Sequence, residues 1–244
     1  MRFRALILGA LGAGLFSSQA AVAQYHHKVR HYSNSGRPYF RGPVHLTLGG
    51  GTALYNGDLG ANPGDNFLGP ALSLGVLYRL SPHLHLGSEL SYFEMGARDK
   101  VKERGLAFTS TNGLGTVFLR FDLLPDESIF ASSVAEPPAF QVYVQGGAGL
   151  LLYNPQAYAG TERAITGTPF LAPERNDYPA LAGVAPVGAG FHVRVIDKLR
   201  AGIEANYYFT TTDQIDDVST RLGGASRNND GFGTVMLKLD YSLK

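Results

Sequence analysis

Three residues near the middle of the chain have side chains that nucleophilic catalysis would need. His83, His85 and Ser88 could supply a base and a nucleophile. The segment alternates apolar and polar residues, so it predicts a strand in which His85 and Ser88 fall on opposite faces, and His83 borders a turn. A base must come within hydrogen-bond distance of its nucleophile. We therefore expect a chain that is not an enzyme.

A second candidate site is acidic. Asp213, Asp216 and Asp217, in the segment TTTDQIDDVST, could give oxygen ligands to a calcium ion. Their spacing does not match an EF-hand loop, and acidic loops are usually solvated, so these three are weak metal candidates. The glycines at 49–51 precede an Asn-Gly turn within a strand pattern, which does not favour a phosphate-binding loop. We expect no cofactor.

The first residues predict export. Arg2 and Arg4 precede a short apolar run, and Ala21-Val22-Ala23 has the small residues of a cleavage site, so residues 1–23 are predicted to be a cleaved signal peptide. The alternative, a membrane anchor, would need about 20 apolar residues. Removing two of the 21 basic residues leaves 19 against 20 acidic residues, a charge of −1. This charge gives no electrostatic basis for binding nucleic acid.

Residues 24–43 form the next segment, which has four basic residues, three histidines and no acidic residue. It lacks periodicity and predicts a flexible basic leader in the periplasm. The alternatives are a docking arm or a histidine metal site at His26, His27 and His31.

The rest of the chain, residues 44–244, reads as one domain of short strands. Eight are predicted, at 44–53, 71–80, 83–93, 115–123, 140–152, 187–195, 199–209 and 232–243. In the last, Val235, Leu237 and Leu239 share an apolar face, whereas Lys238 and Asp240 lie on the other face. Two charges are costly in a dry core but natural where one face meets lipid and the other a polar lumen.

The connections between these strands alternate in length. Residues 81–82 and 196–198 make tight turns, whereas 54–70, 94–114, 153–186 and 210–231 are long, as in outer-membrane barrels. Residues 124–139 are an exception, because this acidic turn is long where a short one is expected. The predicted fold class is all-β, an eight-stranded antiparallel up-and-down transmembrane β-barrel. A soluble, lipocalin-like barrel is the alternative, and it would need an apolar interior.

The predicted inner faces carry nearly balanced charge. The basic members are Arg79, Arg120, Arg194, Arg200 and Lys238, and the acidic members are Glu89, Asp122, Glu204 and Asp240. Such a lumen can neutralise itself in ion pairs. Eight strands enclose only enough space for side chains, so we expect a plugged barrel and no diffusion pore.

Five segments resemble one known family. LGGGTALYNGDL at 48–59, the segment 72–99 after it, ERGLAFTS at 103–110, LLLYNPQAY at 150–158 and TTTDQIDDVS at 210–219 are similar to blocks of a Bacteroidota outer-membrane β-barrel family that includes the type IX secretion barrel PorG. The resemblance implies a barrel in the outer membrane of a Gram-negative bacterium. It also implies a structural or assembly role in a secretion-type envelope complex, with partners among membrane lipid and periplasmic ring proteins. The alternative function is an adhesin or recognition barrel that binds ligands through its external loops.

Overall fold

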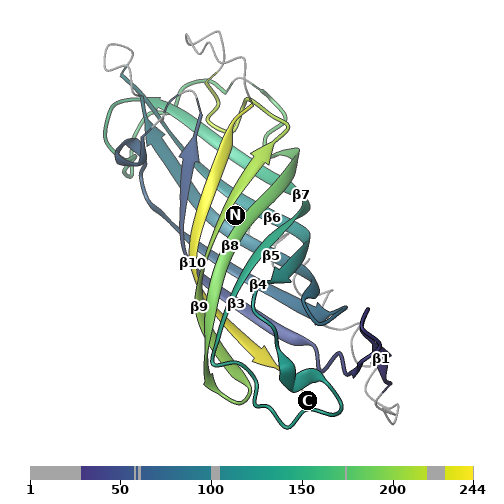
Figure 1. The fold of residues 1–244 in the computed structure, drawn as a ribbon. Coiled ribbons are helices and arrows are strands. Elements are labelled where there is room, and N and C mark those ends of the chain that lie inside the picture. Colours follow the sequence, from purple (N-terminus) through teal and green to yellow (C-terminus); the bar gives the residue numbers. More distant parts are fainter. Residues whose placement is uncertain are drawn as a thin grey trace.

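A computed structural model describes residues 29–57, 59, 62–99, 105–173, 175–218 and 229–243. The predicted signal peptide lies outside these residues. Eight antiparallel strands close into a barrel in the order β10-β3-β4-β5-β6-β7-β8-β9 (Figure 1). The strands are β3 (His45–Asn56), β4 (Gly69–Arg79), β5 (Leu84–Arg98), β6 (Leu106–Asp122), β7 (Phe140–Ala159), β8 (Ala180–Ile196), β9 (Leu199–Thr210) and β10 (Gly231–Ser242). The predicted fold class is confirmed.

The first and last strands close the barrel. β10 pairs with β3 in an unbroken antiparallel register from Gly231 opposite Asn56 to Ser242 opposite His45. The predicted alternation of faces on β10 is correct, since Leu237 is 68 % exposed and Lys238 only 3 %. Closure leaves no free strand edge, so every strand has a hydrogen-bonded neighbour on both sides.

Four strands are at least four residues longer than predicted. β5, β6, β7 and β8 have 15, 17, 20 and 17 residues, and their additional residues lie at one end of the barrel. The segments 94–98, 106–114, 153–159 and 180–186, expected to be loop, are therefore strand. The predicted strands end where the outer face is no longer regularly apolar, but backbone pairing does not require an apolar outer face.

The two ends of the barrel differ. We call "loop end" the one that carries residues 57, 59, 62–68, 99, 105, 160–173, 175–179, 211–218 and 229–230, with the short 3₁₀ helix η2 (Pro63–Asp65). We call "leader end" the one that carries residues 29–43 and the turns 80–83, 123–139 and 197–198, with the 3₁₀ helix η3 (Glu127–Ile129). No helix in the described part of the chain is long and apolar enough to cross a membrane.

The described part of the leader, residues 29–43, has defined contacts. β1 (His31–Tyr32) and β2 (Pro38–Tyr39) form a small hairpin at the leader end, seen beside the barrel in Figure 1. The hairpin docks on the long turn through backbone hydrogen bonds from Phe40 N to Ile129 O, 3.0 Å, and from Ala131 N to Pro38 O, 2.9 Å. The sequence misses this docking because the partner lies some 90 residues away. We call the hairpin and the turn 123–139 together the leader–turn unit.

Candidate functional site

Glu204, on β9, is the centre of the charged interior. Its carboxylate oxygens lie 3.1 Å from Arg120 Nη2 and 3.4 Å from Lys238 Nζ. They also accept hydrogen bonds of 2.9 Å from the Tyr143 hydroxyl and from the Asn206 side-chain amide. The residue is 2 % exposed. A buried carboxylate is tolerated when it is paired and hydrogen-bonded, and all four neighbours contribute to that condition here.

The two cations that bind Glu204 also reach other strands. Lys238 Nζ forms an ion pair with Glu89 on β5 and donates a 2.9 Å hydrogen bond to Ser73 on β4. Arg120 Nη1 lies 3.6 Å from Asp240, and its guanidinium stacks 3.9 Å from the centre of the Tyr143 ring. The network therefore ties together strands on opposite sides of the barrel.

The partners of β10 come from several strands. Lys238 pairs with Glu204 on β9, and the other partners of Lys238 and Asp240 lie on β4, β5, β6 and β8. Long side chains cross an eight-stranded barrel, so neighbours across the lumen count as much as neighbours along the sheet.

Towards the leader end, the interior charges combine with histidines and with the long turn. Asp122 lies 3.6 Å from His85 Nδ1. Arg79 pairs at 3.1 Å with Asp126, which comes from the turn rather than from a strand, and both side chains are buried. Asp126 is a buried acidic residue that the sequence pattern does not predict, because it lies outside any alternating segment.

Two of the nine predicted interior charges lie at the rim of the leader end. Arg194 pairs at 3.0 Å with Glu136 of the long turn, and its side chain is 21 % exposed. Arg200 is partly buried, with its Nη1 3.4 Å from His192 Nε2. Among the described residues, no carboxylate comes within 4.0 Å of Arg200.

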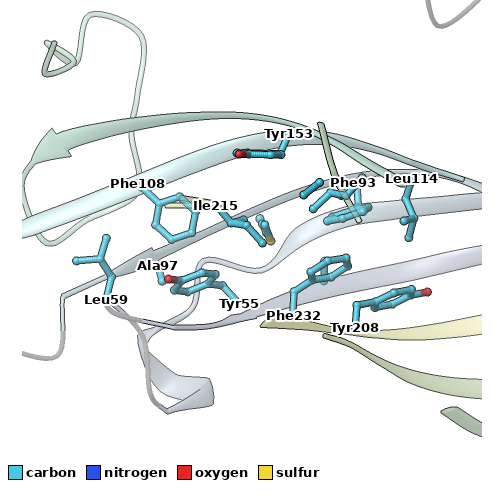
Figure 2. Packing of buried hydrophobic residues seen from close by; sticks show 14 of the residues in the cluster. Tyr55, Leu59, Phe93, Ala97, Phe108, Leu114, Tyr153, Tyr208, Ile215 and Phe232 are labelled. Carbon is cyan, nitrogen blue, oxygen red and sulfur yellow. The ribbon is translucent and has the colours of Figure 1, made fainter. Parts of the chain in front are cut away.

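An aromatic cluster fills the barrel near the loop end (Figure 2). Phe232 stacks between Phe93 and Tyr208, with ring centres 5.0 and 4.5 Å away. Ile215, from the loop after β9, is fully buried in the same cluster. Phe93 and Tyr153 also point inward, with no exposed surface. Apolar interior side chains therefore continue the filling that the charged network begins.

The predicted chemical sites are not assembled. His85 is buried inside the barrel whereas Ser88 is exposed on the outer face, and His83 Nδ1 donates a hydrogen bond to the Asp122 carbonyl oxygen, 2.8 Å away. The geometry thus separates the three residues considered for catalysis.

The acidic loop carries the three weak metal candidates, Asp213, Asp216 and Asp217. Within the described residues, no group of three or more histidine or acidic side chains is placed to hold a metal ion. Asp216 instead lies 2.7 Å from the Tyr55 hydroxyl and accepts a 2.9 Å hydrogen bond from Val218 N. It attaches the loop to the barrel.

The loop end carries a cavity of about 250 Å³ between β7 and the loop that follows it. Phe170, Arg175 and Tyr178 are among the side chains that line it. Arg175 forms a two-bond ion pair with Asp177, with distances of 2.6 and 2.8 Å. This hydrogen-bonded pairing lowers the pKa of the Asp177 carboxyl below its ordinary value.

The outer face of the barrel is apolar on every strand. Examples, 41 to 68 % exposed, are Leu48, Leu72, Val76, Leu90, Val117, Leu119, Val144, Leu150, Val187, Val193, Ile203 and Leu237. Soluble proteins rarely expose so continuous an apolar surface. The barrel thus has its charges inside and its apolar side chains outside.

Solved structures of other barrels resemble this one. No protein-family model matches the chain, and no curated protein sequence is significantly similar to it. The attachment invasion locus protein Ail of Yersinia pestis is 12 % identical, with a TM-score of 0.45, over 84 % of this chain and 100 % of that one. Neisserial surface protein A is 11 % identical, with a TM-score of 0.45, over 82 % and 97 %. OprG of Pseudomonas aeruginosa is 10 % identical, with a TM-score of 0.45, over 83 % and 97 %. These similarities assign no function to this chain.

Proposed function

We propose that the protein spans an outer membrane as a closed, non-enzymatic barrel and serves as a structural or assembly component of a secretion-type envelope complex. The single observation that supports membrane insertion is the apolar outer face around a charged interior. A soluble barrel would have the opposite arrangement, because exposing an apolar side chain to water and removing a charge from water both cost free energy. In lipid, both features are favourable.

Substitution on the outer face tests membrane insertion. Leu237→Lys places a charge in the middle of the apolar face and is expected to cost about 2–4 kcal/mol of stability in lipid. The matched control is Val134→Lys, because Val134 is fully exposed in the long turn at the leader end. Both variants are measured by urea unfolding in lipid vesicles and by retention in the membrane pellet after a carbonate wash. Equal stability of the two variants, or release of the wild type by carbonate, contradicts the proposal.

The assembly role is proposed for the leader–turn unit. This unit presents a folded surface outside the barrel, held by the backbone bonds described above and by the Arg37–Glu127 ion pair of 2.7 Å. With both termini of an even-stranded barrel on the periplasmic side, this surface would face envelope proteins of the periplasm.

Copurification tests the assembly role. Replacing residues 132–136 by glycine and serine alters the exposed tip of the turn and leaves Asp126 with its buried partner Arg79. The expected result is loss of copurifying periplasmic secretion proteins, while the variant still folds. A matched control replaces residues 165–168 at the loop end in the same way. If the wild type retains no envelope protein and export is normal in a deletion strain, the assembly role is wrong.

The alternative function is recognition at the cell surface, and the cavity at the loop end favours it. Aromatic rings and an arginine around 250 Å³ can hold a polar ligand with a planar or ring-shaped apolar face. Phe170→Ala with Tyr178→Ala should then abolish attachment of cells that display the barrel to host cells or polysaccharide. The turn variant 132–136 is the control. Unchanged attachment of the double variant excludes this function.

A further inference from the structure

The mouth of the barrel at the leader end is lined by more positive than negative charge. A cavity of about 160 Å³ there is surrounded by Arg41, His45, Arg79, Lys198 and Arg200, with Asp126 and Asp197 as acidic neighbours. One water needs only about 10–15 Å³ on the same measure, so a small polyatomic ion and several waters fit. The mouth therefore has both the space and the charge for a ligand.

Both acidic neighbours are already engaged. Asp126 pairs with Arg79 at 3.1 Å and accepts a second hydrogen bond from Ser128 N. Asp197 is almost fully exposed, and its carboxylate lies 3.8 Å from Arg194. Within the described residues, neither of these acids lies within 4.0 Å of the other basic side chains of the mouth.

Three cations remain without an acidic partner. Among the residues that the structure describes, no carboxylate lies within 4.0 Å of Arg41, Lys198 or Arg200. The Nε atom of Arg41 is buried, and within those same residues it has no hydrogen-bond partner. Like charges gathered in a partly buried mouth repel one another, and an anion bound between them removes that cost.

From this arrangement we propose that the leader-end mouth binds a phosphate group. Guanidinium groups recognise phosphate through paired, charge-assisted hydrogen bonds, and Lys198 adds a point charge. Arg41, Lys198 and Arg200 come from the leader, the β8–β9 turn and the first residues of β9, so the site exists only when the leader docks.

The phosphate can come from a lipid headgroup or from solution. Arg41 favours the lipid, because its guanidinium lies 5.9 Å from the ring centre of Tyr78, which faces outward at the same end of the barrel. Arg41 thus connects the mouth with the outer surface. The site itself does not depend on membrane insertion; only the lipid source rests on the proposed function.

The test uses the full chain folded in detergent. Inorganic phosphate is titrated by calorimetry, and phosphatidylglycerol is added for native mass spectrometry. Saturable binding is expected for both ligands. Arg200→Gln should lower the affinity for each by at least about tenfold, which corresponds to one charge-assisted hydrogen bond. Lys198→Gln, in an exposed turn, gives the same test if the first variant does not fold. Arg98→Gln, a half-exposed arginine at the loop end, is the matched control.

Each outcome of this experiment decides the proposal. Binding of both ligands that depends on Arg200 and Lys198 supports a headgroup site. Binding of phosphate alone supports the site and rejects the lipid source. No saturable binding by a folded protein, or binding unchanged in Arg200→Gln and Lys198→Gln, overturns the site. A protein that binds phosphate but leaves the membrane pellet on carbonate washing contradicts the proposed function and not this inference.

Discussion

Glu204 joins more of the interior than any alternating pattern could reveal. It binds Arg120 and Lys238, which in turn reach Asp240 and Glu89. Side chains from four strands thereby share one network in a space without water contact. The network adds less to the free energy of unfolding than the loss of one of its members removes, because that loss leaves an unpaired charge buried.

Neutralising Glu204 should therefore cost far more than neutralising an exposed acid. Glu204→Gln keeps the shape of the side chain but leaves Arg120 and Lys238 with one anion fewer. We expect the free energy of unfolding to fall by about 3–5 kcal/mol. The chain has no tryptophan, so urea unfolding in detergent can be followed by tyrosine fluorescence.

Glu136→Gln is the matched control for this measurement. Glu136 also pairs with an arginine, Arg194, but its side chain is 84 % exposed. An exposed ion pair contributes at most about 1 kcal/mol. Similar losses in the two variants would show that the Glu204 network does not stabilise the barrel.

The inward glycine at position 190 tests the close packing of the interior. A methyl group there would lie 2.5 Å from the Tyr143 hydroxyl oxygen and 2.8 Å from the Ile203 carbonyl oxygen. Gly190→Ala should cost about 1–3 kcal/mol, because a backbone atom cannot move away as a side chain can. The control is Gly146→Ala, where the nearest atom would be 3.6 Å away. An unaffected Gly190→Ala variant would mean that this part of the lumen has free space.

At the scale of elements, the sequence determines the strands better than their ends. The period of two predicts all eight strands, their inner and outer faces and the closure of β10 on β3. The pattern fails where the outer face loses its apolar residues, so it does not predict the parts of β5 to β8 near the loop end.

Contacts between distant elements explain the remaining errors. The pairing of Arg79 with Asp126 and the docking of the leader depend on where the turn 123–139 folds in space. No local pattern encodes that position. Charge balance of the lumen was foreseeable from composition, but the partner of each charge was not, because partners lie across the barrel as well as beside each other.

The docking of the leader should depend on pH in a defined direction. The hydrogen-bonded ion pair with Arg37 lowers the pKa of Glu127 below its ordinary value of 4.5. A carboxyl whose pKa is lowered contributes fully above its ordinary pKa, and that contribution is lost as pH falls through the lowered value. Docking should therefore be unchanged from pH 8 to 5 and weaken only below about pH 4.

Spin labels measure this docking directly. The chain has no cysteine, so Ser35→Cys and Ser133→Cys provide two unique labels, one on the leader and one on the turn. The distance distribution between them should be narrow at pH 7 and broad at pH 3. Arg37→Gln should broaden it at pH 7. A distance distribution that changes neither with pH nor in Arg37→Gln would show that the backbone hydrogen bonds alone hold the leader.

At the scale of the whole molecule, the barrel interior is filled in three successive layers. The aromatic cluster closes the loop end, the Glu204 network fills the middle, and the Arg79–Asp126 pair lies below it towards the leader end. Arg120 and Tyr143 in the middle layer are 2 and 1 % exposed. Ions would need a hydrated path through these layers, and most of the charges that could replace an ion's water are already held in ion pairs.

The complete barrel should therefore conduct no ions. In planar bilayers, the wild type is expected to insert without stable current steps, because the aromatic cluster and the Glu204 network fill the lumen between its two ends. Insertion is checked in the same vesicle preparation by gel electrophoresis. Heated protein should migrate more slowly than unheated protein. Deletion of residues 29–43 opens only the leader end, so the deletion variant should also show no stable current steps. A stable open conductance in the wild type would contradict the plug, whereas current only in the deletion variant would assign the closure to the leader rather than to the interior layers.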